Sequence, residues 1–351
     1  MLTQPDATSA PVLDLLFELA RTSATTVTAE RITYHDGSHG LVAVRRLNLP
    51  APDLAREAFF RGARIAALLD HPNLVRLIAV GTEDKPAITM ELVLGESLAC
   101  LIDAARPRNE HPLAPSLAAA VLAEVCDALH ELHELADPET GEPMLLVHNG
   151  VSPRSILLGY DGMARLGGFD HAQVEGDDLT PYLAPEVIAG GKADRRSDVF
   201  SIGALLFELL AGRRMGSDDS GVELPGELGS IYAELTALDP KDRPATAQEV
   251  AVRLREFGAL TASEGGMLLA ARMAQMFPGK REDLVDQLRT GVDPPHTYWG
   301  QDKPRSSPRK VPFITLVLIT LMLTWLANAA FRQKARLTRP AERPASSAPE
   351  R

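Results

Sequence analysis

Two histidines and two glutamates within one helical turn are the residues whose spacing comes closest to a metal site. His130 and His133 are three positions apart, and Glu131 and Glu134 stand beside them. Residues three apart share one face of a helix, so the histidines could bind zinc as a pair. No further ligand follows at a spacing typical of zinc sites, and we therefore expect packed histidines and no metal. The spacing of serine, histidine, aspartate and cysteine residues also gives no nucleophile–base arrangement.

The elements that would position functional residues change in character along residues 12–258. Short alternating runs over residues 12–49 predict antiparallel strands, and helical spacing begins at residue 53. The predicted helices are 53–69, 116–135, 198–212 and 245–257, and the further predicted strands are VRLIAV (75–80), PAITMELV (86–93) and short strands within 145–170. This order predicts an α+β domain with two lobes.

Charge is distributed unevenly along the 351 residues, whose net charge is −11. Residues 301–351 hold ten Lys/Arg and three Asp/Glu, so the rest of the chain is strongly acidic. An acidic body argues against a nucleic-acid partner, because phosphates require a basic surface. The two cysteines, Cys100 and Cys126, cannot build a disulfide framework and are compatible with a reducing compartment.

An uncharged apolar run from Val311 to Phe331 predicts a transmembrane helix. A helix of that length spans ~31 Å, which matches the ~30 Å hydrocarbon core of a bilayer. A buried helix of a soluble domain is the alternative, but basic Pro/Ser-rich residues 292–310 and a short basic tail, 332–351, flank the run. No signal peptide is evident at the N-terminus. We expect a single-pass, tail-anchored protein of the inner (cytoplasmic) membrane, with its N-terminal domain in the cytoplasm.

Five segments follow one another in a fixed order and carry a family resemblance. They are HPNLVRL (71–77), VHNGVSPRSILLGYDGMARLGGFD (147–170), YLAPE (182–186), SDVFSIGALLFELLAG (197–212) and DPKDRPATAQEV (239–250). In this order and spacing they resemble the Hanks-type, eukaryotic-like Ser/Thr protein kinases of bacteria. The resemblance covers residues 12–258 and implies a small lobe over 12–93 and a large lobe over 94–258. Residues 259–291 are then a helical extension.

The phosphate-binding positions that the resemblance implies are changed. Ala20, Thr22 and Thr25 stand where the family has the three glycines that let backbone amides approach phosphate oxygens. Arg45 replaces the lysine that holds the phosphates, and Gly62 replaces the glutamate that pairs with it. Arginine is a planar fork rather than a compact ammonium, so the exchange is not conservative.

The catalytic loop and the metal-binding motif are changed as well. Gly150 stands at the catalytic aspartate, Ser155 at the metal-binding asparagine and Gly168 at the metal-binding aspartate. Ser152 takes the lysine position, where some bacterial relatives also carry serine. Phosphoryl transfer depends on positioned charge and on Mg²⁺, which needs oxygen ligands in octahedral geometry. We therefore expect no normal phosphotransfer and no Mg²⁺-dependent nucleotide binding.

Other family positions are occupied by the expected residue types. The resemblance implies an adenine pocket formed by Val27, Ala43, Met90, Glu91, Val93 and Leu157. It implies structural roles for His148, Phe169, Glu186, Asp198 and Arg243, with Glu186 paired to Arg243 and Asp198 bound to the catalytic-loop backbone. ATP could occupy such a pocket without being required, or the same side chains could pack against one another and fill the cleft.

These observations favour a membrane-anchored pseudokinase that acts as a signalling scaffold or regulator of other proteins, active kinases of the same family among them. One alternative is a weak or unconventional ATP-binding Ser/Thr kinase, and another is a nucleotide or small-molecule sensor that uses the cleft. In the extension, an apolar stripe at helical spacing is expected to pack on its own lobe. Its residues are Met267, Leu269, Met273, Met276 and Phe277.

Overall fold

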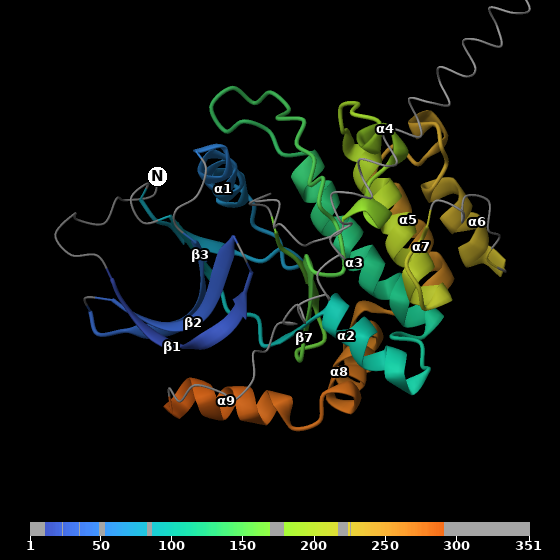
Figure 1. Cartoon of the computed structure of the whole chain (residues 1–351). Coiled ribbons are helices and arrows are strands. Elements are labelled where there is room, and N and C mark those ends of the chain that lie inside the picture. Colours follow the sequence, from blue (N-terminus) through green and yellow to red (C-terminus); the bar gives the residue numbers. More distant parts are fainter. Residues whose placement is uncertain are drawn as a thin grey trace, which may run out of the picture. The chain divides into compact units, whose positions relative to one another are not determined.

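The small lobe is an antiparallel sheet covered by one helix (Figure 1). In this computed structural model the described residues are 11–22, 24–34, 36–48, 53–82, 86–168, 179–216, 224 and 226–290. The strands of the small lobe are β1 (Val12–Arg21), β2 (Thr25–Thr33), β3 (His39–Leu47), β4 (Leu77–Val80) and β5 (Ala87–Glu91), and its helix is α1 (Asp53–Ala66). The strand order is β1-β2-β3-β5-β4.

Strand register brings together residues that are far apart in the sequence. Val27 of β2 lies opposite Arg45 of β3, and Ala43 of β3 lies opposite Met90 of β5. Because side chains alternate between the two faces of a sheet, Val27 and Ala29 share one face of β2. The register therefore decides which side chains reach the interior between the lobes.

The large lobe is mainly helical and begins with a small sheet. Its strands are β6 (Gly95–Ser97), β7 (Ile156–Gly159) and β8 (Ala164–Leu166), and its helices are α2 (Leu98–Ala105), α3 (Pro115–His133), α4 (Pro185–Ile188), α5 (Arg195–Ala211), α6 (Gly226–Leu235) and α7 (Ala247–Gly258). Short 3₁₀ turns lie at Arg106–Arg108, Thr180–Tyr182 and Pro240–Asp242. The α+β, two-lobed architecture expected from the sequence is confirmed.

Helix α5 forms the centre of the large lobe. Every residue from Ser197 to Leu209 is buried, which explains why this segment is apolar on all sides. Asp194 and Ser197 form a reciprocal capping box that starts the helix. Gly212 ends it in the left-handed conformation, with φ +70°, that glycine adopts without strain. The predicted helix, 198–212, therefore begins three residues too late because the polar first turn is not part of the apolar run.

Two further helices, α8 (Ala262–Met276) and α9 (Lys280–Thr290), follow the lobes. Four residues of the predicted apolar stripe are buried, whereas Met267 is 63% exposed. Among the described residues, no helix is both long and apolar enough to cross a membrane. The predicted linker 292–310, membrane span 311–331 and tail 332–351 lie outside the described residues.

Candidate functional site

A cleft between the small-lobe sheet and strand β7 contains a cavity of about 230 Å³. All six residues predicted for the adenine pocket line it: Val27, Ala43, Met90, Glu91, Val93 and Leu157. The sequence left open whether these side chains form a pocket or pack together and fill the cleft. The structure shows that they surround an open space.

The adenine end of the cleft combines apolar walls with an unused backbone edge. Val27 and Ala43 come from β2 and β3, and Leu157 comes from β7 in the other lobe. Val93 belongs to the hinge, the connection between β5 and β6. Within the described residues, no hydrogen bond reaches the backbone N–H or carbonyl of Val93. Such polar groups on an apolar wall can orient a planar heterocycle.

Arg45 and Gly62, two of the changed family positions, also line the cavity. The Arg45 Nε lies 3.4 Å from the Thr25 hydroxyl oxygen. Gly62, within α1, offers no side chain at the position that the resemblance assigns to a glutamate. Glu57 on the same helix instead accepts a hydrogen bond from Arg61 at 2.7 Å, and both side chains are mostly exposed.

Ser155 and Gly168, which stand where the resemblance places the family's metal ligands, lie next to each other. A Cβ atom built on Gly168 would be 3.4 Å from the Ser155 Cβ. The Ser155 hydroxyl is already engaged, since it accepts a hydrogen bond from the Ser152 N–H at 3.0 Å and donates one to the Ser152 carbonyl at 2.9 Å. Neither position supplies the carboxylate or amide oxygen that Mg²⁺ prefers. Gly150 likewise has no side chain that could accept a proton.

Nearby acids do not replace the missing groups within the described residues. Asp161 accepts hydrogen bonds from Arg165 at 2.7 Å and from the Met163 N–H at 3.1 Å, in the turn between β7 and β8. Partial burial raises the pKa of Asp161, but the bonds from Arg165 and Met163 lower it overall. Phe169 and Asp170 lie outside the described residues.

Asp198, which is fully buried, holds the 148–155 loop in place. Its carboxylate accepts hydrogen bonds from the backbone N–H groups of His148 at 2.8 Å and Asn149 at 2.7 Å. It also lies 2.8 Å from Nε2 of His133, so that histidine is part of this network. The His148 ring in turn lies 3.0 Å from the carbonyl of Gly167. The start of the loop is therefore fixed mainly through its backbone, with one further contact from the His148 side chain.

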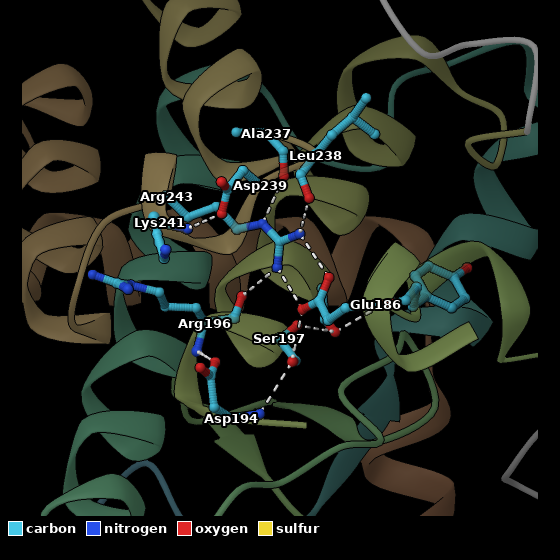
Figure 2. Close-up of polar contacts among 11 residues, drawn as sticks. Glu186, Asp194, Arg196, Ser197, Ala237, Leu238, Asp239, Lys241 and Arg243 are labelled. Carbon is cyan, nitrogen blue, oxygen red and sulfur yellow. Dashed lines mark hydrogen bonds and ion pairs between the residues drawn. The ribbon is translucent and has the colours of Figure 1, made fainter. Parts of the chain in front are cut away.

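A second network surrounds Arg243, whose side chain is buried (Figure 2). Its guanidinium donates to both carboxylate oxygens of Glu186, at 2.8 and 2.9 Å. Further donations reach the carbonyls of Ala237 at 2.8 Å and Arg196 at 3.1 Å, and the Ser197 hydroxyl also donates to Glu186. Partial burial would raise the pKa of Glu186, but the hydrogen bonds from Arg243 and Ser197 hold it below its usual range.

Comparison with known proteins agrees with this geometry. A family model described as the protein kinase domain matches residues 29–281, most of the chain. The chain belongs to the protein kinase family.

Curated relatives of the chain include bacterial kinases. The chain is 30% identical over 301 residues to a Myxococcus xanthus protein named tyrosine-protein kinase MasK, a match that covers 76% of this chain and 46% of that protein. It is 28% identical over 253 residues to the serine/threonine-protein kinase PknB of Mycobacterium tuberculosis, covering 60% of this chain and 38% of PknB. It is 29% identical over 222 residues to the serine/threonine-protein kinase PrkC of Bacillus subtilis, covering 55% of this chain and 32% of PrkC. In each case the match covers less than half of the relative's length.

Some residues of this kinase cleft were not singled out from the sequence. Leu19 of β1 and Arg154 of the catalytic loop also line the cavity. Arg154 stands next to Ser155 in a segment that the resemblance had already placed at the site, so its position was a usable signal. Leu19 lies just before the β1–β2 turn, where only the strand register shows which face it takes.

Proposed function

We propose that this member of the kinase family is a pseudokinase, which uses the fold to bind other proteins and does not transfer phosphate in the normal way. Its targets would include active kinases of the same family. The observation that carries the proposal is the pairing of Ser155 with Gly168 at the position where the metal ligands would meet. No cofactor is required for this role.

The chemical argument concerns the groups that stabilise transferred charge. A positioned base contributes typically ~10²–10⁴-fold, and charge stabilisation contributes about as much. Gly150 removes the base, while Ser155 and Gly168 remove metal ligands. The losses do not simply add, but even two of them would reduce a usual rate of ~1–100 s⁻¹ to almost nothing.

A radiolabel assay tests the absence of phosphotransfer. The full-length chain, purified in detergent, is incubated with Mg²⁺, γ-labelled ATP and a general protein substrate. Ala43→Phe, which places a ring inside the cleft, serves as the matched control for contaminating kinases once its melting curve shows a folded protein. We expect equal, background incorporation for both proteins. Mg²⁺-dependent incorporation that Ala43→Phe abolishes would favour the alternative, a weak or unconventional Ser/Thr kinase.

The regulatory role is tested by mixing. A purified, active kinase of the same family is assayed for autophosphorylation with the full-length chain or with an unrelated membrane protein in the same detergent. The proposal predicts a changed rate together with a complex on size-exclusion chromatography. An unchanged rate without a complex, across the kinases of the same cell, would contradict it.

A second candidate function is a metal-independent nucleotide or small-molecule sensor. It is favoured by the open cavity and by Val93, a lining residue whose backbone N–H and carbonyl form no hydrogen bond within the described residues. A melting-temperature increase with ATP that persists in EDTA would support this function. An increase that requires Mg²⁺ would contradict it.

We also propose that residues 311–331 anchor the chain in the inner membrane with the kinase-family domain in the cytoplasm. The support is the length of the uncharged run and its basic flanks. Membrane fractionation of the full chain and of a chain truncated after residue 310 tests the anchor. Equal recovery of both in the soluble fraction would contradict it.

A further inference from the structure

Helix α8 is fixed to the large lobe by apolar and polar contacts. Leu269, Met273 and Met276 are buried in the core of that lobe. Arg272 donates hydrogen bonds to the carbonyls of Pro112 at 2.9 Å and His111 at 2.8 Å, in the segment between α2 and α3. The helix is therefore packed in a defined position next to α2 and α3 (Figure 1).

A close backbone contact also fixes the position of α8 on the large lobe. Gly162, in the turn between β7 and β8, has φ +82°, and a Cβ atom there would lie 2.1 Å from the carbonyl oxygen of Gly266 in α8. Only glycine permits this approach. Since β7 carries Leu157, the turn links α8 to the strand that forms the floor of the cleft.

Helix α9 leaves the large lobe and packs on the small one. Leu284 and Leu288 are only 3% and 5% exposed. They belong to one apolar cluster with Leu16, Phe17 and Leu19 of strand β1, and the partly buried Leu92 and Leu94 of the hinge region pack against it. The spacing of four residues places both leucines on one face of the helix. The contact thus spans the junction between the lobes on the hinge side.

An ion pair joins the start of α9 to the first strand after the hinge. Lys280 Nζ lies 3.1 Å from a carboxylate oxygen of Glu96, whose side chain is 1% exposed. Burial raises the pKa of Glu96, and the charge of Lys280 opposes the rise. Lys280 also lies over the Phe277 ring at 5.3 Å, which fixes the turn between α8 and α9.

The cluster beneath α9 is continuous with the apolar roof of the cleft. Leu19, Val27 and Ala43, here called the roof residues, line the cavity and also belong to or pack against the cluster that contains Leu284 and Leu288. Protein interiors are close-packed, so removal of α9 would leave the back of the roof without support. The position of α9 and the shape of the cleft are therefore parts of one packing arrangement.

We propose that α8 and α9 form a strap across the hinge that sets the position of the small lobe over the cleft, and that release of α9 frees the roof to move. This inference does not depend on whether the chain transfers phosphate. Helix α9 is the last described element before the linker 292–310, so it is the part of the strap nearest in sequence to the proposed anchor. A binding event near the membrane could act on the cleft by shifting the population of docked α9.

Hydrogen–deuterium exchange on the full chain tests the strap. In Leu284→Ala/Leu288→Ala we expect exchange in β1 and in the hinge region to become at least ~10-fold faster, because two buried leucines are lost. Helices α3 and α5 should exchange as in the unchanged protein. Arg281→Ala/Asp286→Ala, on the exposed face of α9, is the matched control and should change nothing. Unaltered exchange in β1 and the hinge would overturn the proposal, and so would equal acceleration throughout the large lobe.

A second pair of variants keeps the test valid if the double leucine variant does not fold. Lys280→Met leaves the buried Glu96 without its counter-charge, so exchange in α9 and in the hinge region should rise by about tenfold. Lys280→Arg keeps the charge and should restore most of the protection. Equal exchange in Lys280→Met and Lys280→Arg would show that the ion pair does not hold the strap.

Discussion

The polar networks of the large lobe and the family's catalytic positions differ in their side chains. The networks are built from buried charged side chains, whereas several catalytic positions carry glycine. Asp198 and Arg243 are buried charges, and each forms several hydrogen bonds with its surroundings. In contrast, Gly62, Gly150 and Gly168, which stand at three positions where the family has catalytic side chains, have no side chains. The difference shows that the residues that hold the backbone of this fold are not the residues that would act on a ligand.

The largest effect is expected for Arg243→Met. Removing one member of a buried ion pair takes the counter-charge and two hydrogen bonds from Glu186 and one bond each from several carbonyls, which should lower the free energy of unfolding by about 3–5 kcal/mol. Chemical denaturation measures this loss. Arg253→Met, which breaks a partly exposed pair with Glu234, is the control and should cost only ~0–1 kcal/mol. Similar losses for the two variants would remove the distinction between the regions.

Asp198→Asn should have the next largest effect. The amide keeps one acceptor oxygen but loses the charge that two backbone N–H groups and His133 share. We expect a loss of about 1–3 kcal/mol in the same denaturation experiment. Exchange of the His148 and Asn149 amides should accelerate as well, and unchanged protection of both would contradict the role given to Asp198.

The Glu186–Arg243 pair also predicts a pH dependence. Because the pKa of Glu186 is lowered in the folded state, the pair contributes stability above the unfolded pKa of about 4.3. That contribution disappears as the pH falls through the lower, folded value. Denaturation at several pH values should show the difference in stability between the unchanged protein and Glu186→Gln shrinking below about pH 4. A difference that stays constant into acid would argue against the lowered pKa.

Ser155→Ala should have the smallest effect, because within the described residues the Ser155 hydroxyl bonds only to the backbone of Ser152, and the substitution keeps the backbone bonds of residue 155. The expected loss is about 0.5–1.5 kcal/mol, the net value of one ordinary hydrogen bond. Thermal melting with and without Mg²⁺ would sharpen the comparison, since neither protein should respond to the ion. A Mg²⁺-dependent shift in the unchanged protein that Ser155→Ala abolishes would identify a metal site at this residue.

Motif order in the sequence was sufficient to predict the two-lobed fold. Periodicity also located the main helices to within a few residues, as for α3, predicted over 116–135 and found at Pro115–His133. The six adenine-pocket residues were placed by resemblance, and the structure brings them around one cavity. Whether that cavity was open could not be known, because it depends on how far apart the lobes stand.

The surface on which α9 packs could not be predicted from the sequence. Leu284 and Leu288 at a spacing of four indicate an apolar helix face, but hydrophobic burial is non-directional and does not name a partner surface. The contact of Gly162 with Gly266 is hidden for a related reason, since two glycines far apart in the chain give no sign of close approach. The position of α9 and the contact between the two glycines are both determined by tertiary packing.

Calorimetric titration of ATP into the full-length chain, with and without Mg²⁺, tests the central claim most directly. If Ser155 and Gly168 cannot hold the metal, Mg²⁺ will not increase the affinity for ATP, whether or not the adenine end binds. An increase of about tenfold or more with Mg²⁺, lost when Ala43→Phe blocks the cleft, would contradict the account and establish a working metal–nucleotide site.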